Sequence, residues 1–200
     1  MGKRSLIFAV LAGCGHPAPQ APQPAGMPAS PQRLQDHVVA DFERAVLANK
    51  DAYVSLFDFV AVGEYEILLH RYDLNGRLAH LEPDQKAQFA GEDGTPYPET
   101  RERRNVGNFY PTLAQRTVGT GGCTAQVPRT HYGKLLGTMF DPLPEGTPPG
   151  YEKLRTDANQ WLAKGGVVAI KCSGGKGGLA VVYTERASAR GYDLITIYDD

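Results

Sequence analysis

Residues 166–198 decide the fold class of this chain. They read GVVAIKC (166–172), SGGKGG (173–178), LAVVYTER (179–186), ASARG (187–191) and YDLITIY (192–198). The first, third and fifth stretches are rich in β-branched and aromatic residues and have the length of ordinary strands. The two connections are too short for the crossover that parallel strands need. We therefore predict an antiparallel meander of three strands at the C-terminal end of the fold.

The sequence before these strands has the periodicity of amphipathic helices. Helices are predicted over residues 33–48, 51–57, 63–72, 83–91, 98–108 and 151–164. Asp51 is expected to cap the second of them, and Gly165 is expected to end the last. Helices first and strands later are typical of the α+β class. The prediction is a single α+β domain over residues 33–200, with the N-terminal helices packed on one face of an antiparallel sheet that ends in the β-meander.

The N-terminal segment has the pattern of a bacterial export signal. Two basic residues precede an apolar run, residues 5–12, which is too short to span a bilayer. The run ends in Leu-Ala-Gly-Cys at residues 11–14, which resembles the lipobox of bacterial lipoproteins. The resemblance implies that residues 1–13 are removed as a signal peptide, that the Cys14 sulfur receives diacylglycerol and that the new amine is acylated. Two or more acyl chains give stable anchoring in a membrane.

The residue after Cys14 bears on the location of the protein. It is Gly15, whereas enteric lipoproteins that stay in the inner membrane carry aspartate at that place. The resemblance therefore favours the outer membrane, with the protein facing the periplasm or the cell surface. The alternative to a lipid site is an incidental cysteine after a buried N-terminal strand.

Proline is frequent directly after the lipid site. Residues 14–32 contain six prolines interleaved with Ala and Gln, and proline favours extended chain without an amide donor. We expect this segment, which begins at the lipidated cysteine, to act as an extended tether between membrane and domain. The alternative is a disordered stretch of no defined length.

Two cysteines remain for the folded domain once Cys14 carries lipid. Cys123 and Cys172 favour one disulfide in an oxidising compartment, with two buried free thiols as the alternative. The bridge would bring the glycine-rich loop at 119–123 next to the strand end at 170–172. Neither cysteine has a second ligand at the spacing of a zinc site, so no metal and no other cofactor is predicted.

The charge balance excludes one class of partner. The formal net charge is −1, whereas nucleic-acid-binding proteins show a basic excess. Arg101, Arg103 and Arg104 could bind an anion, but Glu99 and Glu102 lie in the same run. A solvated helix face is the favoured interpretation of this run.

No catalytic residue can be assigned from the sequence. The stretch at 173–178 lacks the spacing of a P-loop, and His70, His80 and His131 lack the spacing of metal ligands. Five aromatic residues are expected either to fill the core or to line a cavity: Tyr53, Phe57, Phe59, Tyr65 and Tyr72.

The opening of the domain resembles one known superfamily. Residues 41–45 (DFERA) and 49–57 (NKDAYVSLF) are similar to the first helices of NTF2-like (SnoaL-like) proteins. The resemblance implies a sheet curled into a cone over the helices.

Taken together, these features predict a lipid-anchored cell-envelope protein that binds a small ligand or an envelope partner and has no catalysis of its own. Its membrane contact is the lipid on Cys14. One alternative is a small-molecule enzyme with an NTF2-like pocket, which a closed, aromatic-lined pocket holding a His–Asp or Asp–Arg pair would favour. Another alternative is an accessory of envelope assembly.

Overall fold

The computed structural model describes residues 31–74, 95–117, 121–128, 139–174, 178–186 and 189–199. Its elements, in chain order, are α1 (Pro31–Ala48), α2 (Lys50–Val54), α3 (Phe59–Leu74), α5 (Glu99–Thr117), β1 (Cys123–Gln126), α7 (Tyr151–Ala163), β2 (Gly165–Cys172), β3 (Leu179–Glu185) and β4 (Tyr192–Asp199). The predicted signal peptide, Cys14 and the predicted helix at 83–91 lie outside the described residues.

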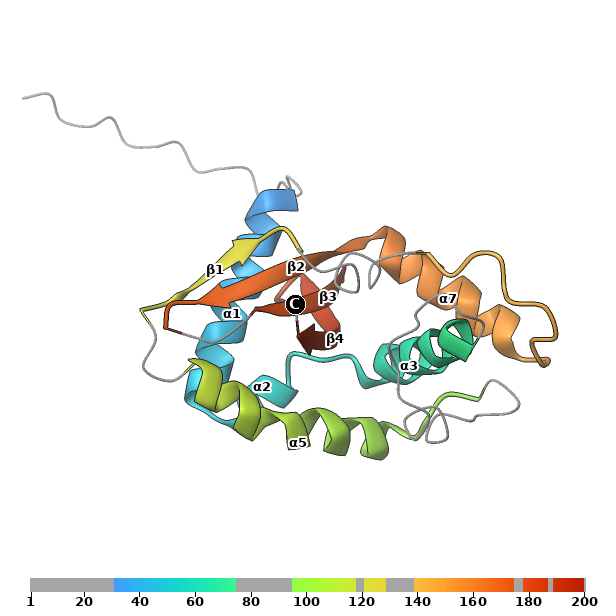
Figure 1. The fold of residues 1–200 in the computed structure, drawn as a ribbon, viewed down its shortest axis with the longest axis horizontal. Helices are drawn as coiled ribbons and strands as arrows, with labels where there is room; N and C mark the ends of the chain where they lie inside the picture. The colour runs from blue at the N-terminus through green and yellow to red at the C-terminus, as the bar shows by residue number, and fades with distance from the viewer. Residues whose placement is uncertain are drawn as a thin grey trace, which may run out of the picture.

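One antiparallel sheet with the strand order β1-β2-β3-β4 lies at the centre of the molecule (Figure 1). The last three strands form the predicted meander, and each lies within a residue of its predicted bounds. Strand β1 was not predicted, and it pairs with β2 from Cys123 opposite Cys172 to Gln126 opposite Ala169. The α+β class is therefore confirmed.

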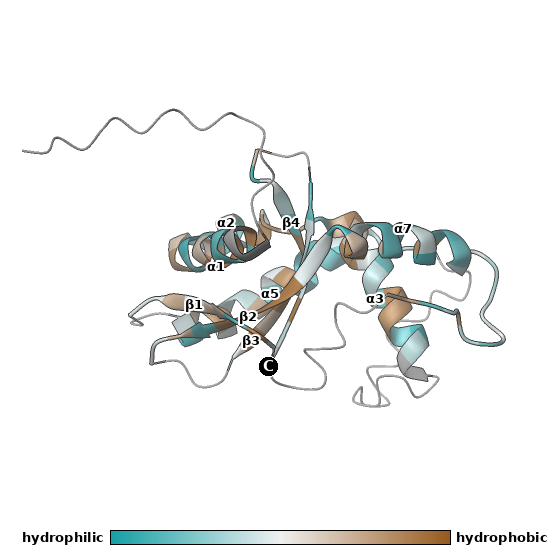
Figure 2. Cartoon of the chain, turned by 90° about the horizontal axis from the view of Figure 1, so that it is seen from above, coloured by the Kyte–Doolittle hydropathy of each residue, from teal (hydrophilic) through white to brown (hydrophobic). Residues whose placement is uncertain are grey.

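Helices cover both faces of this sheet, so the prediction that they pack on one face was wrong. Residues of α1 and α2 form one core with Val181 and Tyr183 of β3. Residues of α3 and α7 form a second core with Ala180 and Val182. Strand β3 has no solvent-facing side, because its residues are suited to burial on both faces. A layer of helices therefore covers each face. Figure 2 shows hydrophobic residues both in the strands and in the helices around them.

The N-terminal helices begin and end for identifiable reasons. Helix α1 begins at Pro31 instead of Arg33, which suits proline because its missing amide would have no helical partner there. Helix α2 is capped by Asn49, whose side chain accepts a hydrogen bond from the Ala52 amide at 2.8 Å. The prediction that Asp51 is the cap was therefore wrong.

The two later helices also depart from their predicted ends. Helix α5 continues through Pro111 to Thr117 and buries Leu113 against the first core, so packing extends it beyond residue 108. Helix α7 ends with Lys164 as its cap, and Gly165 begins β2. No described helix is long and apolar enough to cross a membrane.

Candidate functional site

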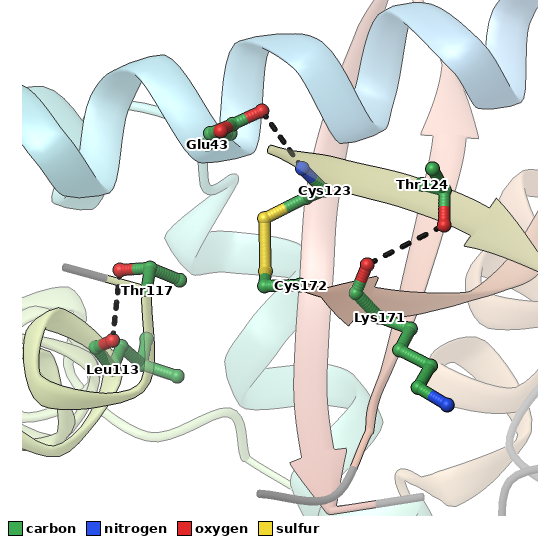
Figure 3. The surroundings of a disulfide bond; sticks show 7 residues. All are labelled: Glu43, Leu113, Thr117, Cys123, Thr124, Lys171 and Cys172. Atoms are coloured by element: carbon green, nitrogen blue, oxygen red, sulfur yellow. Dashed lines mark hydrogen bonds between the residues drawn. A yellow bond between two sulfur atoms is a disulfide. The ribbon is translucent and has the colours of Figure 1, made fainter. Parts of the chain in front are cut away.

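The structure joins the two cysteines for which a disulfide was expected. Cys123 and Cys172 lie opposite each other in β1 and β2, and their sulfur atoms are bonded at 2.04 Å. The Cys123 amide donates a hydrogen bond to Glu43 Oε2 of α1 at 3.2 Å (Figure 3). In the described part of the glycine-rich loop, the Gly122 carbonyl accepts a hydrogen bond from the Ser173 amide at 2.9 Å. The bridge therefore holds β1 between the edge of β2 and α1.

The three arginines that could bind an anion have different surroundings. Arg101 lies over the Tyr97 ring, with its guanidinium carbon 4.0 Å from the ring centre. Arg103 pairs with Glu99 at 2.5 Å and lies over the Phe59 ring at 4.4 Å. Arg104 is exposed and has no ion pair or hydrogen bond with any described residue. The run is thus not one uniform solvated face.

A groove of about 570 Å³ lies between α2 and α5 and contains the free arginine. Its walls come from one turn of α2 and the first turns of α5. The lining residues are Lys50, Asp51, Val54, Ser55, Thr100, Arg103 and Arg104. The volume is within the range of small-molecule sites. The three cations and one carboxylate of the lining give the groove a positive balance.

Lys50 is placed in this groove by the absence of a side chain at Gly107. A Cβ at that position would lie 2.6 Å from Lys50 Cε and 3.1 Å from its Nζ. The lysine stem therefore crosses α5 at the glycine and keeps its ammonium near the arginines. Among the described residues Lys50 has no ion-pair partner. Like charges held close together are unfavourable for folding. The position of these cations in one groove therefore favours a role in binding.

A second notable cluster contains two glutamates from α3 and α5. Glu66 accepts hydrogen bonds from Tyr198 Oη at 3.1 Å and from Thr196 Oγ1 at 3.4 Å. Burial raises the pKa of Glu66 to about 7, with a smaller contribution from the charge of Glu102. The two hydrogen bonds oppose this shift. Glu66 is therefore poised to change its protonation near neutral pH.

Glu102 was expected on a solvated face, but it is only 3% exposed. Its Oε1 makes no hydrogen bond and lies 4.0 Å from Arg101 Nε. Burial raises the pKa of Glu102, while the nearby Arg101 lowers it. Burial thus raises the pKa of both glutamates, and the charge of Glu102 on α5 adds to the shift of Glu66 on α3.

Comparisons of this chain with protein families, with curated proteins and with solved structures find no match.

The five aromatic residues belong to the two cores. Tyr53, Phe57 and Phe59 lie in the first core, where the Tyr53 and Phe57 rings meet edge to face at 5.3 Å. Tyr65 and Tyr72 lie in the second core. They fill the space between helices and sheet, as the core interpretation predicts.

An Asp–Arg pair is present, but it connects elements of the fold. Arg186 lies between Asp58 and Asp193, and its Nε is 3.2 Å from Asp193 Oδ2. Asp58 Oδ1 also accepts the Val60 amide at 3.1 Å, at the start of α3. Arg186 borders a cleft of about 360 Å³ at the end of α7. The pair ties the start of α3 to the β3–β4 hairpin.

The remaining sequence candidates contribute no site in the described chain. His70 is buried on α3, whereas His80 and His131 lie outside the described residues. Over the part of the chain that the structure describes, no three His, Cys, Asp or Glu side chains are placed to hold a metal ion. Of the stretch at 173–178, the structure describes Ser173, Gly174 and Gly178, between β2 and β3.

Sequence reasoning missed the residues that matter most in both clusters. Lys50 and Glu66 each belong to a helix whose partner helix, α5, comes much later in the chain. The one available signal was Gly107 inside the charged helix of residues 98–108, since a conformationally costly glycine in a helix often marks a close approach.

Proposed function

We propose that this chain is a lipid-anchored protein of the bacterial cell envelope whose α+β domain binds a small ligand or an envelope partner and has no catalysis of its own. The observation that carries the proposal is the Leu-Ala-Gly-Cys sequence at 11–14, placed directly after a short apolar run. We further propose the outer membrane as the location, because Gly15 follows the lipid site.

The disulfide supports an exported protein. Cys123–Cys172 is a bonded pair within the sheet, and such structural bridges persist in oxidising compartments and are rare in the cytosol.

The groove between α2 and α5 supports a binding role. It has the size of a ligand site and is lined by cations that make no ion pair across it. The aromatic side chains that could have lined an enzyme pocket are packed into the two cores.

The raised pKa of Glu66 favours a second candidate, a small-molecule enzyme. A carboxylic acid with a pKa near 7, such as Glu66, has the property that general acid–base catalysis requires. Carboxyl groups with a shifted pKa also occur in purely structural networks. If the chain is an enzyme, Glu66→Gln abolishes turnover of its substrate, whereas a binding protein keeps its affinity for the ligand.

Intact mass of the membrane-extracted protein tests the anchor and the export. The sample is measured with and without reduction before thiol alkylation. The expected mature chain starts at Cys14, carries acyl mass and takes up alkyl groups only after reduction. A full-length, unacylated chain with three freely alkylated thiols would overturn the proposal.

A further inference from the structure

We propose that the α2–α5 groove binds a small, hydroxylated phosphate ester from the soluble phase of the envelope, through Lys50 and Arg104. The inference rests on the proposed function in one respect, namely that the ligand comes from the envelope. The groove itself is argued from the positions and charges of its lining residues.

Lys50 and Arg104 provide the charge that an anionic group needs. They come from opposite walls of the groove, and neither is paired with a described carboxylate. Arg103 stands beside them, but Glu99 already pairs with its guanidinium at 2.5 Å. Lys50 reaches α5 at Gly107, so both free cations lie at the α5 side of a groove whose lining contains one carboxylate, that of Asp51.

The mixture of groups favours phosphate over a single carboxylate. An ammonium, a guanidinium and the Thr100 hydroxyl are separate donors in the lining, and a phosphate group offers three terminal oxygens as strong acceptors. The first turn of α5, which contains Thr100, adds the positive end of a helix dipole. Inorganic phosphate alone would leave most of the 570 Å³ unfilled.

The remaining lining residues select the organic part of the ligand. Asp51 would repel a second anionic group, but its carboxylate can accept hydrogen bonds from hydroxyl groups. Val54 adds one apolar contact, and Ser55 adds an oxygen that already donates to the Ala52 carbonyl at 2.7 Å and can still accept. Hydroxyl groups next to a phosphate fit this wall better than an acyl chain.

The place of the groove in the fold favours a soluble ligand over the lipid of the anchoring membrane. The tether enters the domain at Pro31, at the start of α1, and the groove begins at Lys50, just past its end. Figure 1 shows these two ends of α1 on opposite sides of the molecule. A helix of 18 residues is about 27 Å long, so the groove faces away from the point of attachment.

Calorimetric titration of the membrane-extracted protein with glycerol phosphate tests the inference. Sodium chloride at equal ionic strength and free glycerol are the reference titrations. We expect saturable binding of glycerol phosphate and no heat of binding for either reference. Lys50→Met with Arg104→Gln should weaken the affinity at least tenfold, whereas Lys171→Met, which removes an exposed cation of β2, should leave it unchanged.

Gly107→Ala separates a built site from general positive charge. The new methyl group displaces the Lys50 stem while every charge remains, and alanine favours the helix. We expect glycerol phosphate to bind several-fold more weakly. Asp51→Asn should increase the affinity for inorganic phosphate relative to the affinity for glycerol phosphate.

Equal affinity in the parent protein and the Lys50/Arg104 double variant, or heats no larger than those of sodium chloride, would overturn the phosphate site. The mass measurement described above reports independently on the anchor. An acylated protein that does not bind glycerol phosphate would refute only this inference. An unacylated protein that binds glycerol phosphate at the groove would refute the envelope role.

Discussion

Glu66 gives the folded chain a pH sensitivity that extends to neutral pH. Its carboxyl lies between α3, α5 and β4, and its pKa is raised from 4.5 to about 7, chiefly because burial disfavours the charged form. Between these two values the folded chain holds a proton that the unfolded chain has lost. Stability therefore falls as pH rises through this window and stays at the lower level above it.

Glu66→Gln should remove that dependence. The amide keeps an acceptor for Tyr198 and Thr196 but carries no charge to desolvate. We expect the variant to be more stable than the parent by up to about 3 kcal/mol at pH 8 and nearly equal to it at pH 4.5. Urea denaturation at both pH values measures this difference. Glu145→Gln, at an exposed position, is the control, and equal gains in the two variants would contradict the assignment to Glu66.

Gly165 has a steric role that its sequence position does not suggest. A Cβ there would lie 1.9 Å from the Tyr183 carbonyl oxygen and 2.8 Å from Thr184 Cα, and neither backbone atom can move without disturbing β3. Gly165→Ala should therefore destabilise the fold by roughly 2 kcal/mol or more. Gly121→Ala meets only ordinary contacts at Ser173, so its denaturation midpoint should stay close to that of the parent.

The elements that the sequence predicts well are those with a local pattern. Strands β2, β3 and β4 are apolar runs bounded by glycine-containing connections, so their bounds could be predicted to within a residue. Strand β1 is short, and its pattern is set by pairing with β2 and by Glu43, neither of which is visible locally. Helix α5 passes Pro111 because Leu113 is buried, which again depends on distant residues.

The disulfide should matter most for β1. This strand is four residues long, and the bridge joins it to the sheet across a sequence separation of 49 residues. The double variant Cys123→Ala/Cys172→Ala should lose about 4 kcal/mol, because the unfolded chain regains the freedom of a loop of that size. The amides of β1 should then exchange faster with solvent than those of β3. Unchanged exchange in β1 would show that Glu43 and the β2 pairing suffice.

At the scale of the whole molecule, the two cores lie on either side of β3. This arrangement explains why the sequence could predict the strand but not the helices that cover each of its faces. The alternation of Ala180, Val181, Val182 and Tyr183 between the two cores follows from strand geometry, but an apolar run alone does not say what covers each face. The candidate groove depends on the same long-range packing, because it sets α2 against α5. The residue types were visible in the sequence, and their juxtaposition was not.

The proposed anchor should be separable from the folded domain. Every core residue in the part of the chain that the structure describes lies at or beyond Leu34, so Cys14→Ser should leave the melting temperature of the domain unchanged. The same change should move the protein out of the membrane fraction, since the acyl chains have lost their site. Fractionation followed by thermal denaturation measures both outcomes. Retention of the serine variant in washed membranes would show that something other than lipid on Cys14 holds the protein there.

The strand shared by both cores also sets the order in which the chain can fold during synthesis. Strand β3 begins at Leu179, after all the described helices, so each of these helices leaves the ribosome before the central strand of the sheet exists. Neither core can close until the final strands have been translated. Until then both cores remain incomplete, and an incompletely folded chain is the state that a translocation channel accepts.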